Sequence, residues 1–582
     1  MVLLSQYMKQ SMIRVGVLTA ILFFSLIIRL YRANVVPVAP YWDEVAILAD
    51  ARMILETGRD LHSNAWFQPM FISYGDYKMP VYIWLTTFFS QFFGVTVFAV
   101  RFGNILAGVG SVLLAGLLSV ELLDLLAPTV TKQFKRLALF FSMGTAAIIP
   151  WGVHFSRSGF EAYFAQFLLG TAVYVLLIGL RKKPINYSKR KLVVLALVSG
   201  LLAALAMYTY FSIRVVLPIL FPLIILVTNF IYRYEKLNTV VPRNVSLFFI
   251  ASAVILLSLV PLLTSPLYEQ SNGFRLSTSS LLELAPFVEE SNSLAASMGN
   301  SFQSKTLFHR RVLQGKFFLT SIAKHLSPTY LFFEGDQNLR HGTTKHGLLL
   351  LTMAPGLVAG WLWLFSNNKA LALVLGGWWF AALLPASIPL ETPHALRSLN
   401  AVLPITISIG IGFAALATWL QRKTKALQAT VVLLFFFVLT FECIQYWHYY
   451  LQVYPKTSSQ SWQHGYTALA QIVYEQSQTK AVWIPDYERR LWLWLYAFTS
   501  LDTQVIQESI KTGGPLPKVI GRISIHDVQS EDLNELTDPV VIVANTFLAD
   551  HIASLSNHAP TTVFTIQTTD PTFSYKALYY EP

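Results

Sequence analysis

Two neighbouring carboxylates, Asp43 and Glu44, follow the first long apolar run of the sequence, in the segment Tyr41-Trp42-Asp43-Glu44. They fall where that run should leave a membrane. Acidic side chains at a membrane surface are costly unless they are hydrated, paired or used in function. A carboxylate at the mouth of a membrane cavity can take a proton from an acceptor hydroxyl or amine. The structural alternative is that Asp43 caps an amphipathic helix and Glu44 complements its dipole.

A second candidate carboxylate, Glu161, stands at the start of another apolar run. It could orient an acceptor beside Asp43, or the two could hold a divalent cation such as Mg²⁺ or Mn²⁺. The sequence leaves that metal requirement open. Arg157 could pair with Glu161 or hold a phosphate. The structural alternative is that Ser158–Glu161 is the capping box of a helix.

Three further polar side chains could bind an anion. Lys78 follows Asp76 in a short polar segment, and His394 and Arg397 share one helix face because they are three residues apart. Lys78 could bind a phosphate, and His394 with Arg397 could form a phosphate clamp. Asp76 could be a third carboxylate of the site. The alternatives are a lysine that reaches the lipid headgroups, a turn residue at Asp76, and a polar collar at headgroup level.

The composition indicates a membrane protein. Of 582 residues, 54% are hydrophobic and 13% are charged, whereas a soluble domain has about 25% charged residues. The net charge of +12 is better explained by membrane topology and headgroup attraction than by a nucleic-acid partner, because no basic stripe interleaved with aromatics is present. Cys443 is the only cysteine, which excludes an intrachain disulfide and a CxxC metal site.

Apolar runs of about 20 residues can cross a bilayer. We expect about eleven such helices, near 13–32, 100–126, 137–153, 161–180, 192–210, 214–232, 246–264, 346–366, 370–386, 398–420 and 427–448. The run 79–98 contains Pro80, Gln91 and Gly94, and we interpret it as an interfacial helix. An amphipathic helix from Asp43 to about Gly58 should also lie at the interface.

The basic residues orient these helices. The connections 127–136, 181–191, 233–245, 367–369 and 421–426 all carry lysine or arginine, which predicts a cytoplasmic side and a cytoplasmic N-terminus in the plasma (inner) membrane. The candidate acids, the loops 33–99 and 265–345 and the C-terminal segment then lie outside. We expect a transmembrane domain at 1–450 and an extracytoplasmic α/β accessory domain at 451–582, where short apolar runs alternate with helical stretches.

Four motifs in this order resemble a known group: Tyr41–Glu44, Gly75–Pro80 with Tyr82, Phe155–Glu161 and Pro393–Arg397. The chain is similar to the GT-C superfamily of multi-pass glycosyltransferases, and within it to family 39 protein mannosyltransferases and bacterial aminoarabinose transferases. The resemblance covers roughly residues 10–450. It implies an α-helical polytopic fold of the GT-C type.

The resemblance also implies roles for the candidate residues. Asp43 would be the catalytic base, with Glu44 beside it and Glu161 in support, although many relatives carry Asp at the second position. Donor phosphate binding would fall to Lys78, Arg157, His394 and Arg397, and substrate binding to Trp42, Asp76 and Tyr82. The reaction implied is inverting transfer of a sugar from a polyprenyl-phosphate donor to a lipid, glycan or protein acceptor.

Other functions remain open. A transporter or lipid flippase usually holds ionisable residues at mid-membrane depth, and in this sequence Glu442 is the main residue of that kind. An O-antigen ligase or polymerase and a non-catalytic scaffold for cell-wall assembly are further alternatives. We expect no nucleic-acid partner.

Overall fold

The computed structural model describes residues 2–181, 188–236, 240–271, 285–514, 516–556 and 559–581, with residues 2–14 described by their backbone alone. Parts of three predicted connections, 181–191, 233–245 and 265–345, therefore lie outside the described residues. The chain divides into two compact units. The first comprises Met1–Tyr31, Asn104–Ser156 and Glu161–Trp447, and the second comprises Arg32–Gly103, Arg157–Phe160 and His448–Pro582. The sequence-based boundary at 450 did not anticipate that residues 32–103 group with the C-terminal segment.

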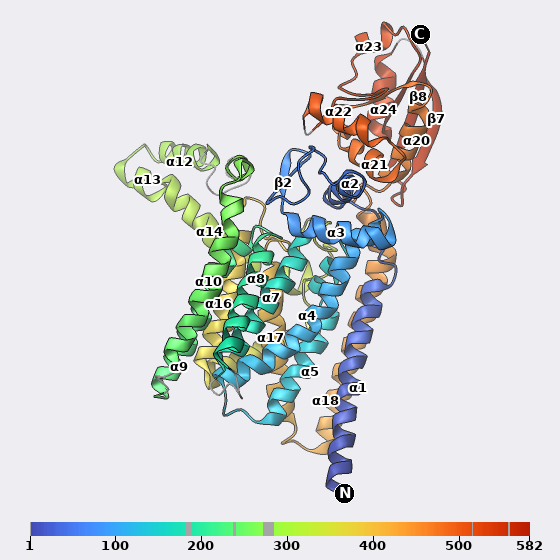
Figure 1. Cartoon of the computed structure of the whole chain (residues 1–582). Helices are drawn as coiled ribbons and strands as arrows, with labels where there is room; N and C mark the ends of the chain where they lie inside the picture. The colour runs from blue at the N-terminus through green and yellow to red at the C-terminus, as the bar shows by residue number, and fades with distance from the viewer. Residues whose placement is uncertain are drawn as a thin grey trace. The chain divides into compact units, whose positions relative to one another are not determined.

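The first unit is a bundle of long apolar helices (Figure 1). In the described part of the chain, eight helices are long and apolar enough to cross a membrane, and α5 with α6, bent by 56°, would make a ninth. The prediction of a multi-pass membrane protein is confirmed. The bundle also includes shorter helices that are not among these spans. In chain order its main helices are α1 (Val2–Leu30), α4 (Val97–Leu126, which begins in the second unit), α5 (Lys132–Ile148), α6 (Pro150–Ser156), α7 (Glu161–Leu180), α8 (Lys189–Met207), α9 (Ile213–Tyr234), α10 (Val241–Leu263), α15 (Ala354–Asn367), α16 (Lys369–Ser387), α17 (Val402–Leu420) and α18 (Lys425–His448).

The run predicted as a span at 346–366 is helical only from its middle onward. The short helix η2 (Leu351–Met353) and then α15 follow a non-helical stretch in which Leu349 N donates to Leu331 O at 2.8 Å. Gly347 lies against the backbone of Phe332, where an added Cβ would be 2.3 Å from its carbonyl carbon. Since α15 has only 14 residues, it is about 21 Å long and too short to span a bilayer core of about 30 Å unaided.

The described part of the long loop 265–345 is mostly helical. It contains α12 (Ala285–Ser297), α13 (Phe302–Leu307), α14 (Arg310–Leu326) and η1 (Thr329–Phe333). After η1 the chain runs through a polar stretch that contains Asp336 and His341 before it reaches η2.

The second unit begins with the helix predicted after the first span. α2 (Trp42–Thr57) ends at Gly58, whose left-handed φ of +70° suits glycine. The N-cap position is Tyr41, so Asp43 lies in the first turn rather than at the cap. A hairpin of β1 (Phe71–Ser73) and β2 (Asp76–Lys78) leads into α3 (Pro80–Phe93). With 14 residues, α3 is too short to cross a bilayer alone.

The C-terminal part of the second unit is the predicted α/β domain. Its six-stranded sheet has the order β4-β5-β3-β6-β8-β7, with β3 parallel to both neighbours and the remaining pairs antiparallel. The strands are β3 (Ala481–Ile484), β4 (Val519–Ile520), β5 (Ile523–Ile525), β6 (Val540–Asn545), β7 (Thr561–Gln567) and β8 (Ser574–Tyr580), and the longer helices are α20 (Tyr466–Ser477), α21 (Leu491–Phe498), α22 (Thr503–Gly513) and α24 (Thr546–Leu555). Every residue of β6 is buried.

Candidate active site

The carboxylate of Asp43, in the first turn of α2, is the centre of a polar cluster in the second unit. One of its oxygens accepts a hydrogen bond from the Tyr41 hydroxyl, and the other accepts from the Tyr74 hydroxyl and forms an ion pair with Lys78 Nζ. The side chains of Asp43 and Lys78 are 17% and 8% exposed. The carboxylate is therefore held firmly and still reaches the surface of the unit.

The β1–β2 hairpin supplies two of these partners. Ser73 pairs with Asp76, which leaves Tyr74 and Gly75 as the turn, and Gly75 has a φ of +89° that favours glycine. Burial, and then the charge of Asp43, raise the pKa of Tyr74 well above its ordinary value. The Tyr74 hydroxyl therefore stays protonated and donates to Asp43.

A second cation, Arg490, lies at the same cluster. Its guanidinium carbon is 4.2 Å from the centre of a Trp42 ring and 5.3 Å from that of the Tyr74 ring, both within cation–π range. Arg490 immediately precedes α21, so the C-terminal domain contributes to the cluster. Sequence analysis missed Arg490 and Tyr74, because no local pattern links them to Asp43.

Glu44 has a different environment from Asp43. Its side chain and that of Arg101 are fully buried and form a two-pronged ion pair, with Nε–Oε1 at 2.8 Å and Nη2–Oε2 at 3.0 Å. The other three N–H groups of Arg101 donate to the carbonyl oxygens of Ala33, Pro37 and Ala39 at 2.8–3.0 Å. All five donors of the guanidinium are satisfied, so this pair organises the loop before α2.

The segment Arg157–Phe160 also belongs to this unit and is anchored by Glu44. Gly159 N donates to Glu44 Oε1 at 2.6 Å, and a Cβ on Gly159 would lie 2.9 Å from Glu44 Cγ. Arg157 is fully buried, donates to Val36 O at 3.1 Å, and lies 5.6 Å from the Tyr450 ring. These contacts stabilise the fold around Glu44 and Arg157. The catalytic role of Glu44 and the phosphate-binding role of Arg157 remain predictions.

The residues predicted to bind substrate differ in exposure. Tyr82 is buried and its hydroxyl donates to Val100 O at 2.6 Å, so it is committed to the protein interior. Trp42 and Asp76 are half-buried, and Trp42 lies at the Arg490 contact described above. The structure brings Trp42, Asp43 and Lys78 together and leaves their roles as predictions.

The surroundings of Asp43 suit an ion-paired carboxylate better than a ligand of a divalent cation. Lys78 and Tyr74 already contact one oxygen and Tyr41 contacts the other. A metal ion there would meet the ammonium of Lys78 at close range, which like charges oppose. The residues around Asp43 therefore do not fit a divalent cation.

The other predicted site residues belong to the first unit. Glu161 is the first residue of α7, and His394 and Arg397 lie in the segment between α16 and α17. Burial, and then the positive charges nearby, lower the pKa of His394 well below its ordinary value. His394 is therefore neutral at pH 7 and supplies no charge to a phosphate. The expected meeting of Glu161 with Asp43 remains a prediction.

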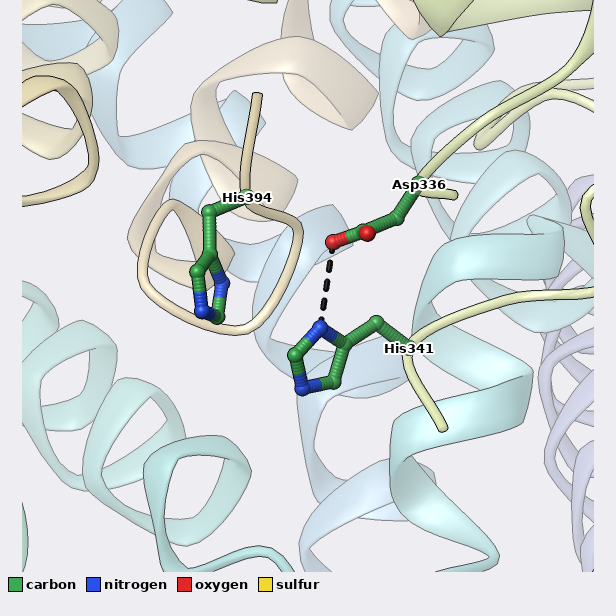
Figure 2. Close-up of side chains that lie close together, drawn as sticks. All are labelled: Asp336, His341 and His394. Atoms are coloured by element: carbon green, nitrogen blue, oxygen red, sulfur yellow. Dashed lines mark hydrogen bonds and ion pairs between the residues drawn. The ribbon is translucent and has the colours of Figure 1, made fainter. Parts of the chain in front are cut away.

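His394 is part of a buried cluster that the sequence analysis did not identify. Asp336, His341 and His394 each offer one ligand atom within 4.8 Å of the others, and Figure 2 shows the three side chains facing one another. His341 Nδ1 is 3.2 Å from Asp336 Oδ2, which also accepts from Ala395 N at 2.7 Å. Burial opposes ionisation of Asp336, but the adjacent His341 and its hydrogen bonds lower the pKa of the carboxyl below its ordinary value.

Glu442, the acid expected at membrane depth, caps a helix. Its carboxylate accepts hydrogen bonds from Leu351 N, from Thr352 N at 3.0 Å and from Thr352 Oγ1 at 2.6 Å. These donors lie at the start of η2, where backbone N–H groups need an acceptor. The local contacts therefore account for this acid without a transport role.

Comparison with known proteins identifies the fold. No protein-family model and no curated protein sequence matches the chain. Among solved structures, it is similar to ArnT from Cupriavidus metallidurans bound to undecaprenyl phosphate, with a TM-score of 0.52 and 12% identity over 98% of each chain. The apo form of the same protein gives a TM-score of 0.49 at 12% identity and the same coverage. The archaeal oligosaccharyltransferase AglB from Archaeoglobus fulgidus gives 0.47 at 14% identity, over 84% of this chain and 64% of that one.

The similarity to the undecaprenyl phosphate-bound structure agrees with the helical bundle and the C-terminal sheet domain described above. The chain therefore shares its fold with ArnT, which agrees with the α-helical polytopic fold expected from its sequence motifs.

Proposed function

We propose that this protein is a glycosyltransferase that moves a sugar from a polyprenyl-phosphate donor to an acceptor at the outer face of the membrane. The observation that supports it best is the Asp43 cluster. A partly exposed carboxylate is held by Lys78 and by two tyrosine hydroxyls, in a chain with the fold of a protein that was solved with undecaprenyl phosphate.

In the proposed reaction Asp43 is the base. It takes the proton of the acceptor hydroxyl or amine as that group attacks the anomeric carbon of the sugar. The bond from the anomeric carbon to the phosphate oxygen breaks, and polyprenyl phosphate leaves with the bonding electrons. One displacement at this carbon inverts its configuration. The donor is already activated, so no nucleotide and no metal step is required.

Lys78 has two roles in this proposal. Without donor it neutralises Asp43, through the ion pair described above. A donor phosphate would compete for the same ammonium, because a dense anion attracts Lys Nζ strongly. Transfer of Lys78 from Asp43 to the phosphate would stabilise the leaving group and release the base in the same event. Donor binding would thus activate Asp43.

The first unit has apolar cavities that suit a lipid tail. One of about 750 Å³ lies among residues of α5, α15, α17 and α18, including Phe141, Phe413 and Phe435. Another of about 590 Å³ is lined by α1, α5 and α18 residues such as Val17, Phe140 and Phe436. A polyprenyl chain in the bilayer is already out of water, so such a cavity would hold it by van der Waals packing and not by the hydrophobic effect.

We also include in this proposal three residues predicted from the sequence to contact the substrates, Glu161, Arg157 and Arg397. Glu161 would orient the acceptor, and the two arginines would lie near the donor phosphate. The expected proximity of Glu161 to Asp43 can be tested with the double variant Asp43→Cys and Glu161→Cys on a Cys443→Ser background. Formation of a disulfide-linked pair, or of a short bis-maleimide crosslink within the chain, would support a shared site. Failure of every linker up to about 10 Å would remove Glu161 from the proposal.

The function itself is tested by a donor panel. Purified protein in liposomes is incubated with polyprenyl-phosphate sugars that differ in the sugar, and release of polyprenyl phosphate is followed with and without a crude membrane acceptor. At least one donor should be consumed faster than in empty liposomes. Movement of intact donor across the bilayer without cleavage would favour a flippase instead.

A further inference from the structure

The cluster of Asp336, His341 and His394 has no task in the proposed reaction. All three residues are buried, with exposed fractions of 3%, 6% and 4%. Burying an acid with two imidazoles is costly unless they are paired or bind an ion. Two of the ligands come from the segment that follows η1, and the third comes from the segment between α16 and α17. The cluster therefore joins two separate loops of the first unit.

The donor set is specific for a class of ions. Imidazole nitrogens suit zinc and neighbouring transition metals, whereas Mg²⁺ and Ca²⁺ prefer oxygen ligands alone. Two histidines and one carboxylate are also a known zinc set, which leaves a fourth position for water or another ligand. Metal binding by these side chains would release any protons that they carry, because imidazoles bind as neutral groups and carboxylates as anions.

The surrounding hydrogen bonds fix the ligands in place. His394 N donates to His325 Nε2 at 2.9 Å, and His325 Nδ1 in turn donates to Ser321 O at 2.8 Å. This relay holds the His394 backbone and uses both nitrogens of His325, so His325 supports the cluster without being a ligand. Asp336 is held by Asn338 N at 2.9 Å and by Ala395 N at 2.7 Å. Such outer contacts are typical of metal sites.

The cluster can contract around an ion. Ligand atoms of tetrahedral zinc lie about 3.3 Å apart, and here the three lie within 4.8 Å of one another. The ring centres of His341 and His394 are 4.6 Å apart, so small side-chain rotations would suffice. His394 Nδ1 accepts a long bond of 3.4 Å from Arg397 N. This nitrogen therefore carries a lone pair, which a metal would take over at little cost.

From this geometry we infer that Asp336, His341 and His394 form a binding site for one divalent transition-metal ion of the Zn²⁺ class, which ties the loop after η1 to the loop before α17. The site shares no residue with the Asp43 cluster, and the inference does not rest on the proposed glycosyl transfer. Its role is to fix the relative position of these two loops.

Metal content tests the inference directly. The full chain is purified without a polyhistidine tag, loaded with Zn²⁺, freed of excess metal by gel filtration, and analysed by mass spectrometry. We expect about one zinc per chain. Asp336→Asn, His341→Asn and His394→Asn should each weaken retention at least about tenfold. His551→Asn, which changes an exposed histidine of α24, is the matched control and should retain zinc.

A second experiment distinguishes loss of a metal ligand from misfolding, because it looks for a new absorption band and not for lost zinc. On a Cys443→Ser background, His394→Cys offers a thiolate in place of an imidazole. With Co²⁺ bound it should show a sulfur-to-cobalt absorption band in the near ultraviolet, and the control His551→Cys should show none. Absence of zinc from the wild-type chain, or equal zinc in all variants, would overturn the inference and leave a buried polar network only. Absence of the cobalt band in His394→Cys would overturn it as well.

Discussion

The ion pair of Glu44 and Arg101 gives the sharpest stability prediction. Both side chains are fully buried, and Glu44 also accepts from Gly159 N at 2.6 Å. Replacement of Arg101 by Met leaves a buried carboxylate without its counter-ion. Replacement of Glu44 by Gln leaves Arg101 with three carbonyl partners, which offset part of the lost charge. Arg101→Met should therefore be the more damaging change.

Breaking a buried pair from one side costs about 3–5 kcal/mol. For a unit of roughly 150–250 residues, about 2–4 °C of midpoint corresponds to 1 kcal/mol. Arg101→Met should therefore lower the unfolding midpoint of the second unit by about 6–20 °C, and Glu44→Gln by an amount near the lower end of that range. The double variant should lose less than the sum of the two, because the two side chains interact.

The assay is thermal unfolding in detergent at one fixed scan rate, since membrane proteins commonly unfold irreversibly. Asp550→Asn is the matched control. It breaks a 2.7 Å ion pair with Lys576 in which the Asp550 side chain is 59% exposed, and exposed pairs contribute only about 0–1 kcal/mol. A Glu44→Gln or Arg101→Met midpoint shift no larger than that of Asp550→Asn would refute the structural role of the pair.

Two further predictions concern the same unit. Lys78→Met should raise the donor KM about 10- to 100-fold, because a hydrogen bond to a charged group is worth about 1.5–3 kcal/mol; steady-state kinetics with Lys576→Met as control would check this, and an unchanged KM would contradict the phosphate role. Asp50→Asn should stabilise the unit. Burial, and then the charge of Asp60, raise the pKa of Asp50 well above its ordinary value. Between the pKa of Asp50 in the unfolded chain, about 4, and its pKa in the folded protein, the native state binds more protons than the unfolded state. The free energy of unfolding therefore falls as pH rises through this range. The gain in midpoint should thus be larger at pH 8 than at pH 5, and an equal gain at both would contradict the pKa argument.

Much of the membrane fold follows from composition alone. Helices such as α7 and α9 are continuous apolar stretches, and their predicted bounds agree with the structure within a few residues. The late start of α15 was not predictable, because the preceding residues pair with Leu331 in another segment. The break between α5 and α6 has a sequence signal in Pro150, the first residue of α6. The grouping of residues 32–103 with the C-terminal segment depends on long-range contacts, which no local pattern encodes.

Some residues of the candidate site could be predicted from the sequence, and others are evident only in the structure. Asp43 and Lys78 were chosen for their residue types and their place beside apolar runs, and the structure brings them into contact. Arg490 is more than 400 residues away in the sequence, and only the folded C-terminal domain brings it to Trp42. Likewise, η2, α15 and α16 separate His341 from His394 in the sequence, so residue spacing could not predict that the two side chains lie close together.

The central claim is that Asp43 is the base of a sugar transfer, and the most direct measurement is the rate at which purified protein releases polyprenyl phosphate from its best donor. A general base contributes about 10²- to 10⁴-fold to the rate. Asp43→Asn should lose activity by that factor in protein that is still folded, as judged by a cooperative thermal unfolding transition, while Asp550→Asn keeps its activity. An Asp43→Asn variant that still cleaves the donor at the wild-type rate would contradict the account.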